Sequence, residues 1–126
     1  MPAGSILVVD DDPEINRLVG AYVEMAGYRY RSALDGEAAL AEVREQVPDL
    51  VILDVMLPDL DGFEICRRVK SITNGRAVPV IMLTALDNDE SREKGQQCGA
   101  SHYLTKPFDP DHLMETLARL GSIVEK

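Results

Sequence analysis

The sequence predicts an α/β fold, a three-layer sandwich in which five helices cover the two faces of a five-stranded parallel sheet. Short apolar runs rich in branched residues alternate along the chain with segments whose apolar residues recur at helical spacing. Strands that alternate with helices predict a parallel sheet with right-handed crossovers. The length of 126 residues suits one domain, so we expect residues 1–126 to form a single unit.

The strands are predicted from their apolar runs. Residues 50–53 and 78–83 are short, continuous and apolar, which is typical of strands that are buried on both faces. Residues 6–9 form a third run of this kind. Residues 28–33 are a weaker candidate, and residues 101–104 are a short one.

Acidic residues mark the beginnings of the predicted helices. A proline, which is favoured at the first helical position, follows the first and the last of these acids. The third and fourth stand three residues before a glutamate, which is the spacing of a capping box. Gly27 is expected to end the first helix. The expected caps are Asp12, Asp35, Asp61, Asp87 and Asp109.

Apolar residues at helical spacing predict which face of each helix is buried. The fourth helix is mostly polar and offers no such face. The residues expected to face the core are Ile15, Leu18, Val19, Tyr22 and Met25 in the first helix, Ala38, Leu40, Ala41 and Val43 in the second, Ile65, Val69 and Ile72 in the third, and Leu113, Leu117 and Leu120 in the fifth.

The formal net charge of −9 limits the partners of the chain. Affinity for nucleic acid comes from lysine and arginine, so direct binding of DNA or RNA is not expected. An acidic domain also repels phosphorylated substrates unless a cation intervenes. We therefore expect a metal ion at any site of phosphate chemistry.

The chain shows no sign of export or of membrane insertion. No apolar run approaches the roughly 18 residues of a membrane span, and residues 1–5 lack the basic region of a signal peptide. The two cysteines, Cys66 and Cys98, match no metal or redox spacing and are expected to be reduced, buried thiols. These observations favour a cytoplasmic location.

Polar side chains follow four of the predicted strands. Asp10 and Asp11 end the first strand, Asp54 follows the third, Thr84 the fourth, and Lys106 comes soon after the fifth. The carboxyl ends of parallel strands meet at one edge of the sheet, where open α/β sheets bind ligands. We therefore expect these residues to converge in one crevice.

A simpler explanation applies to each of these residues alone. A carboxylate at a strand end is often only a helix cap, a threonine there can be a turn residue, and a lysine can be a surface charge. The combination of Asp10, Asp11 and Asp54 is harder to explain in this way, because crowded carboxylates repel one another. Carboxylate oxygens suit Mg²⁺, and a carboxylate can attack phosphorus to form an aspartyl phosphate.

At these residues the chain resembles the receiver domain of a two-component response regulator. The matching segments are ILVVDDDP at residues 6–13, PDLVILDVMLP at 48–58, DG at 61–62, TA at 84–85 and KPF at 106–108. The resemblance covers essentially the full length. It implies the flavodoxin-like sheet order 2-1-3-4-5, an order that the chemotaxis receiver also has. It also implies a cis peptide bond between Lys106 and Pro107.

The resemblance implies a role for each site residue. Asp54 is expected to accept a phosphoryl group, with Lys106 pairing with a phosphoryl oxygen. Mg²⁺ is expected to bind Asp10, Asp11, Asp54 and the backbone carbonyl of Met56. Thr84 and Tyr103 fall at the positions of the switch pair, which couples the acceptor to a partner-binding face formed by the fourth helix, fifth strand and fifth helix.

The resemblance also implies partners. The phosphoryl donor is expected to be a sensor histidine kinase or a phosphotransfer protein, and the reader an effector protein or an output domain, with homodimer formation possible on phosphorylation. The chain is expected not to be an enzyme, beyond Mg²⁺-dependent self-phosphorylation and self-dephosphorylation. Residues 99–103 lack the two acids that winged-helix regulators often have there, which argues against the charged dimer face of that branch.

The sequence argues against two other functions. A Mg²⁺-dependent phosphohydrolase of the haloacid dehalogenase kind needs a second acid two residues after the nucleophile, where this chain has Met56. A degenerate receiver, which binds partners without being phosphorylated, lacks residues that this chain retains.

Overall fold

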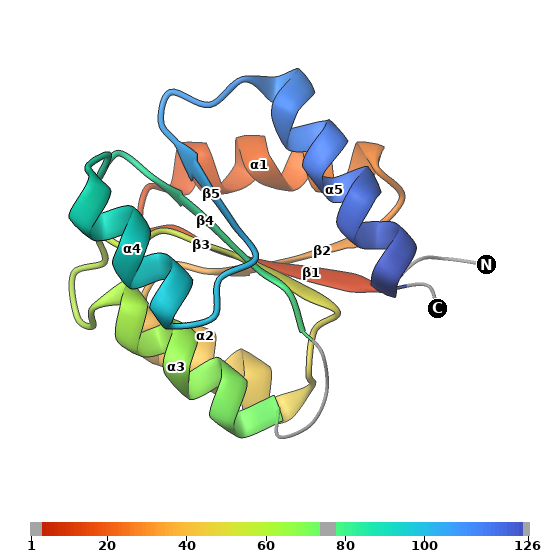
Figure 1. Ribbon diagram of the computed structural model, residues 1–126. Helices are drawn as coiled ribbons and strands as arrows, with labels where there is room; N and C mark the ends of the chain where they lie inside the picture. Colours follow the sequence, from red (N-terminus) through yellow and green to blue (C-terminus); the bar gives the residue numbers. More distant parts are fainter. Residues whose placement is uncertain (1–3, 74–77, 125–126) are drawn as a thin grey trace.

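The computed structural model describes residues 4–73 and 78–124, and it has the predicted α/β architecture (Figure 1). Residues 1–3, in the segment where no signal peptide is expected, lie outside this description. Each strand lies within two residues of its predicted position. The elements are β1 (Ser5–Val9), α1 (Pro13–Met25), β2 (Arg29–Ala33), α2 (Gly36–Glu45), β3 (Leu50–Leu53), α3 (Gly62–Thr73), β4 (Val80–Thr84), α4 (Asp89–Gln97), β5 (His102–Thr105) and α5 (Pro110–Val124).

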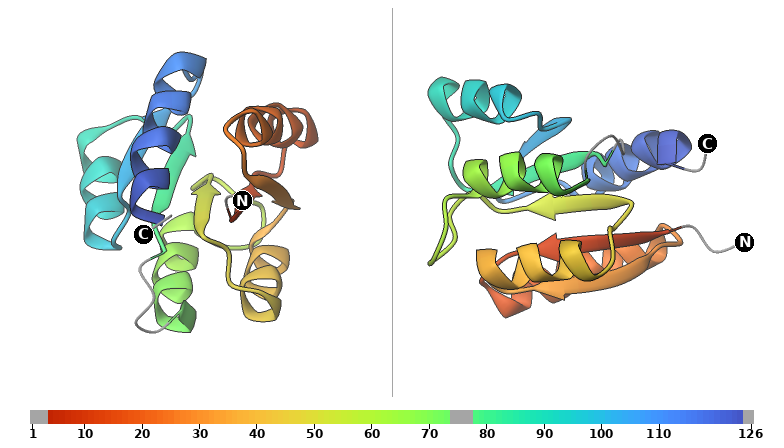
Figure 2. Two further views of the ribbon diagram at one scale, coloured as in Figure 1. Left: turned by 90° about the vertical axis from the view of Figure 1, so that its right-hand side faces the viewer. Right: turned by 90° about the horizontal axis from the view of Figure 1, so that it is seen from below.

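The five strands form one parallel sheet in the order β2-β1-β3-β4-β5, as the resemblance implies. Helices α1 and α5 cover one face of the sheet, and α2, α3 and α4 lie on the other (Figures 1 and 2). Alternate residues of the central strands therefore enter two separate aliphatic cores. Ile6 and Val8 pack with α1 and α5, whereas Leu7 and Val9 pack with α2 and α3. The three-layer prediction is confirmed.

Backbone pairing aligns the carboxyl ends of the strands. Val9 is in register with Ala33 of β2 and with Leu53 of β3. The pairing continues one residue further, because the Asp10 N–H donates to the Ala33 carbonyl at 3.2 Å and the Asp54 N–H donates to the Val9 carbonyl at 2.9 Å. The sheet itself therefore brings two acidic side chains from distant parts of the sequence to the same edge.

Most of the predicted helix caps are confirmed. Asp12, Asp35, Asp61 and Asp109 each accept a hydrogen bond from a backbone N–H in the first turn of the following helix. The prediction for α4 is wrong by one residue. Its cap is Asn88, which accepts from the Ser91 N–H at 2.8 Å, while the carboxylate of Asp87 binds Arg92 instead.

The predicted buried faces of α1 and α2 are partly wrong. In α1, Leu18 is 45% exposed and Met25 is 70% exposed, and Asn16 takes a place in the buried stripe. In α2, Ala39 is buried and the predicted Ala38 and Ala41 are exposed. An apolar side chain at helical spacing thus does not guarantee burial. The alanines are small and Met25 is the last residue of α1, whereas Leu18 is a large side chain in the middle of α1 that lies at the border of the buried stripe. The predicted faces of α3 and α5 are buried or half-buried.

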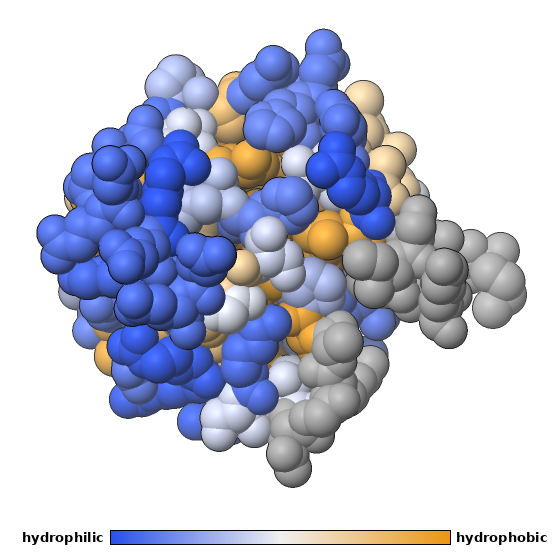
Figure 3. Space-filling model, in the orientation of Figure 1, coloured by the Kyte–Doolittle hydropathy of each residue, from blue (hydrophilic) through white to orange (hydrophobic). Residues whose placement is uncertain are grey.

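The molecular surface over α4 is strongly hydrophilic (Figure 3). This agrees with the composition of the helix, in which only Ser91 and Gly95 are buried. Among the described residues, no helix combines the length and the apolar character needed to cross a bilayer.

Candidate functional site

The structure brings Asp10, Asp11 and Asp54 together at the carboxyl edge of the sheet. One carboxylate oxygen from each lies within 4.8 Å of the others. Asp10 and Asp54 are only 3% and 5% exposed, whereas Asp11 is open to solvent. The expected convergence of the three acids is therefore observed. A set of hard oxygen donors with one exposed member fits a small, partly hydrated cation such as Mg²⁺.

Lys106 reaches this cluster from the loop that follows β5. Its ammonium group donates to Asp10 Oδ2 at 2.7 Å and to Asp54 Oδ2 at 2.8 Å. Burial lowers the pKa of Lys106, but the hydrogen bonds to both carboxylates and their negative charges together outweigh it, and the net pKa is raised. The peptide bond between Lys106 and Pro107 is cis, as the resemblance implies.

Burial dominates the ionisation of Asp10. Its desolvation raises the pKa of the carboxyl group, although hydrogen bonds from Lys106 and from the Asp12 N–H act in the opposite direction. A cation at this site therefore stabilises a carboxylate that burial destabilises.

Backbone N–H groups hold the second oxygen of each buried carboxylate. The Asp12 N–H donates to Asp10 Oδ1 at 3.0 Å, and the Met56 N–H donates to Asp54 Oδ1 at 2.9 Å. In each carboxylate, one oxygen accepts from a backbone N–H and the other accepts from Lys106, which fixes the orientation of the carboxylate. The Met56 side chain is 56% exposed and points away from the core.

Asn16 is a structural support of the site that the sequence did not reveal. This buried amide donates to the backbone carbonyls of Asp10 and Ala33, both at 3.1 Å. Its own oxygen accepts from the Ser32 hydroxyl at 3.0 Å and from the Tyr30 hydroxyl. The network ties α1 to the ends of β1 and β2 beneath the carboxylates. The one available signal was a polar residue between apolar positions of an amphipathic helix.

Thr84 and Tyr103 are linked through the backbone of Leu86. The fully buried Thr84 hydroxyl accepts from the Leu86 N–H at 3.2 Å. The Tyr103 hydroxyl donates to the Leu86 carbonyl at 2.6 Å, and burial raises its pKa. A change at the Thr84 hydroxyl therefore has a short, bonded route to Tyr103.

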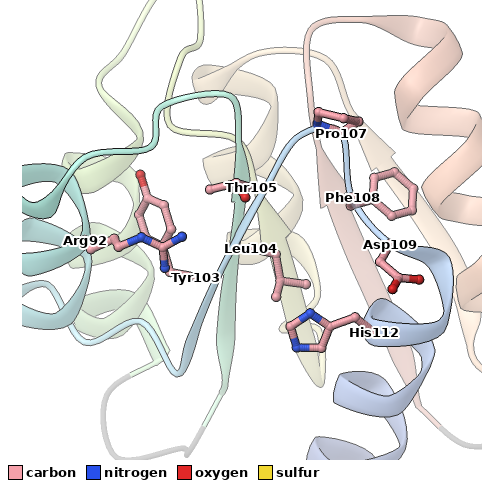
Figure 4. A pocket seen from close by; sticks show the side chains of 8 residues that line it. All are labelled: Arg92, Tyr103, Leu104, Thr105, Pro107, Phe108, Asp109 and His112. Carbon is pink, nitrogen blue, oxygen red and sulfur yellow. The ribbon is translucent and has the colours of Figure 1, made fainter.

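A cavity of about 280 Å³ lies beside Tyr103, between α4 and the start of α5 (Figure 4). Arg92 forms one side, with its guanidinium carbon 5.1 Å from the centre of the Tyr103 ring. Phe108 and His112 lie across the cavity from that pair (Figure 4). None of the three acids of the cluster lines this cavity.

Comparison with known proteins agrees with this site. The family model described as response regulator receiver domain matches residues 6–118. The chain is 43% identical over 121 residues to the DNA-binding dual master transcriptional regulator RpaA of Synechocystis sp., covering 96% of this chain and 49% of that protein. It is 44% identical over 124 residues to the response regulator PleD of Caulobacter vibrioides, covering 96% of this chain and 27% of that protein. The chain thus spans half or less of these relatives.

Solved structures show the same fold. The chemotaxis protein CheY4 of Vibrio cholerae superimposes with a TM-score of 0.86 at 35% identity, covering 95% of this chain and 99% of that chain. The BeF3-activated receiver domain of DrrB, a Thermotoga maritima protein, gives a TM-score of 0.87 at 42% identity, covering 95% of this chain and 97% of that chain.

Proposed function

The chain belongs to the response regulator receiver family, and from this premise we propose that Asp54 accepts a phosphoryl group from a sensor histidine kinase or a phosphotransfer protein. A receiver is a signalling domain and not a classical enzyme. The observation that supports Asp54 is its place at the end of β3, where its carboxylate lies beside two further acids and a lysine. In the reaction, an Asp54 oxygen forms a bond to phosphorus, and the bond from phosphorus to the donor breaks with its electron pair leaving on the donor.

We propose that Asp10, Asp11, Asp54 and the Met56 carbonyl hold Mg²⁺, which supplies positive charge to the phosphoryl oxygens when bound. The transferring group resembles metaphosphate, so catalysis is mainly charge neutralisation and positioning. Lys106 already contacts the acceptor carboxylate at 2.8 Å. It therefore needs only a small movement to pair with a phosphoryl oxygen on Asp54.

The switch that follows is proposed to run from Thr84 to Tyr103. The Thr84 hydroxyl can donate a charge-assisted hydrogen bond to a phosphoryl oxygen on Asp54, and this bond is stronger than the neutral one that it accepts from the Leu86 N–H. Turning toward the phosphoryl group draws the hydroxyl away from Leu86. When that hydroxyl moves away, the Leu86 backbone, whose carbonyl accepts from Tyr103, is free to move. Space then opens for the Tyr103 ring to turn inward. The surface formed by α4, β5 and α5 then changes. The available energy is the difference in affinity of the phosphoryl group for the two arrangements.

Thr84→Ala should remove the coupling between the phosphoryl group on Asp54 and Tyr103. We expect beryllofluoride, which mimics the phosphoryl group, to shift the NMR signals of Tyr103 and Arg92 in the wild type, and most of that shift to be lost in the variant. Thr84→Ser keeps the hydroxyl and is the matched control. Equal shifts in Thr84→Ala and wild type would show that the signal takes another route.

The partners follow from the same proposal. Residues 1–126 act as one receiver domain in the cytoplasm, and an effector protein or an output domain reads the face of α4, β5 and α5. Homodimer formation on phosphorylation is one form of that output. The net charge of −9 supports the absence of direct nucleic-acid binding by this domain.

Incubation with acetyl phosphate and Mg²⁺, followed by intact mass measurement, tests the proposed function. We expect one phosphoryl adduct in the wild type and none in Asp54→Asn, which keeps the shape of the side chain but is a poor nucleophile. Turnover without an adduct would instead indicate a phosphohydrolase. The absence of both an adduct and turnover would indicate a degenerate receiver.

A further inference from the structure

The segment between β3 and α3 carries both Asp54 and Met56, and its conformation is held by its own hydrogen bonds. The Met56 N–H binds the Asp54 carboxylate at 2.9 Å. Met56 also forms an isolated antiparallel bridge with Asp61, and the Gly62 N–H donates to the Val55 carbonyl at 3.0 Å. These bonds close the segment on itself. They do not fix its position relative to the rest of the molecule.

Asp59, at the exposed end of this segment, makes that connection. Its Oδ1 accepts from the Gly36 N–H at 2.8 Å, and its Oδ2 accepts from the Glu37 N–H at 2.9 Å. These are the first two residues of α2. The two backbone bonds, to Gly36 and Glu37, lower the pKa of Asp59. The local cap of the same helix, Asp35, serves a different group, the Ala38 N–H, at 2.7 Å.

Packing holds the same junction closed. A β-carbon built on Gly36 would lie 2.9 Å from Cβ of Leu60 and 2.8 Å from Cδ1 of Ile65. Such distances are too short for real contacts, so only glycine allows this approach. The segment from Val55 to Asp61 is therefore pressed against the start of α2 and clamped there by a carboxylate.

We propose that Asp59 is a positioning residue for the metal site, acting through the 55–61 segment. This inference rests on the proposed function, since it takes the Met56 carbonyl and Asp54 as ligands. Asp59 itself does not touch the acidic cluster. By binding the start of α2, Asp59 fixes where the Met56 backbone stands relative to the carboxylates of Asp10, Asp11 and Asp54, which the sheet and Lys106 already hold. Groups that orient metal ligands from outside are commonly worth a large part of the affinity.

Asp59→Ala and Asp35→Ala form a matched pair for the test. Both remove one negative charge and one capping side chain from the start of α2, and both should lower the melting temperature. Only Asp59→Ala releases the segment that carries Met56. We expect the dissociation constant for Mg²⁺, measured by NMR titration, to rise about tenfold in Asp59→Ala and to stay close to the wild-type value in Asp35→Ala. Asp59→Asn retains one acceptor oxygen and should lie between.

The outcomes separate the two proposals. A wild type that does not bind Mg²⁺ would overturn the proposed metal site, and this inference with it. A wild type that binds Mg²⁺ with the same affinity as Asp59→Ala and Asp59→Asn would overturn the positioning role alone. Equal weakening in the Asp59 and Asp35 variants would also overturn it, because the effect would then come from charge or helix capping.

Discussion

Replacing Lys106 with methionine should destabilise the Mg²⁺-free protein by about 3 kcal/mol, the lower end of the range for breaking a buried ion pair. The ammonium group is the one cation in contact with Asp10 and Asp54 among the described residues. Its loss leaves two nearly buried carboxylates facing each other. The side chain of Lys106 is 20% exposed, so water relieves part of the penalty and the upper end of the range is not reached.

Urea unfolding at neutral pH, with and without Mg²⁺, measures this effect. Mg²⁺ should stabilise Lys106→Met more than the wild type, because no lysine competes for the carboxylates. Adding Asp54→Asn to Lys106→Met should recover much of the lost stability, since it removes one of the two negative charges that repel each other. A Lys106→Met variant as stable as the wild type would show that the ion pair is not formed in solution.

The pH dependence of this ion pair has a definite sign. The pKa of Lys106 is raised above its ordinary value of 10.5. Its contribution to stability is therefore fully present below pH 10.5 and is lost as the pH rises through the higher pKa of the folded state. The share of the stability difference between wild type and Lys106→Met that comes from the lysine should thus be present at neutral pH and shrink in strong alkali.

The phosphorylated protein should lose its phosphoryl group slowly. Hydrolysis needs a water in line with phosphorus, opposite the Asp54 oxygen, and a polar side chain near that path can orient it. In receiver domains the residues that flank this path stand two residues after the acceptor aspartate and two after the switch threonine, and these positions here hold Met56 and Leu86. Neither side chain can hold a water, and their bulk shields the phosphoryl group.

Met56→Asn combined with Leu86→Glu should accelerate the decay by at least about tenfold without preventing phosphorylation. The measurement is the loss of the adduct in Mg²⁺ after removal of acetyl phosphate, followed by intact mass. Met56→Leu combined with Leu86→Met keeps both positions apolar and should decay like the wild type. Rapid decay of the wild type, or no acceleration in the polar pair, would contradict the shielding argument.

The convergence of the acidic site was predictable from sequence because it depends on one rule of topology. Asp10 and Asp54 directly follow apolar strands, and parallel strands place such residues at a common edge. Roles such as that of Tyr103 came from the resemblance and not from spacing. The contact between Lys106 and both carboxylates depends on the conformation of the loop after β5, and hydrophobic periodicity does not predict loop conformation.

The features that sequence reasoning missed are of another kind. Asn16 and Asp59 each bind backbone groups that lie many residues away. The sequence does not distinguish them from any other asparagine in a helix or any other exposed aspartate. Asn88 shows a smaller error, since adjacent residues with similar side chains compete for one cap and local packing decides between them.

The strand order has a consequence for the protein as it is synthesised. β2 and β3 pair with β1, β4 pairs with β3, and β5 pairs with β4. Every strand after β1 therefore joins a neighbour that has already been synthesised, and the sheet grows outward from β1 one strand at a time. A nascent chain that ends after α3 already contains both neighbours of β1. Each strand from β2 to β5 thus finds its native partner as soon as it is synthesised, which limits the time that this new strand is exposed without a partner.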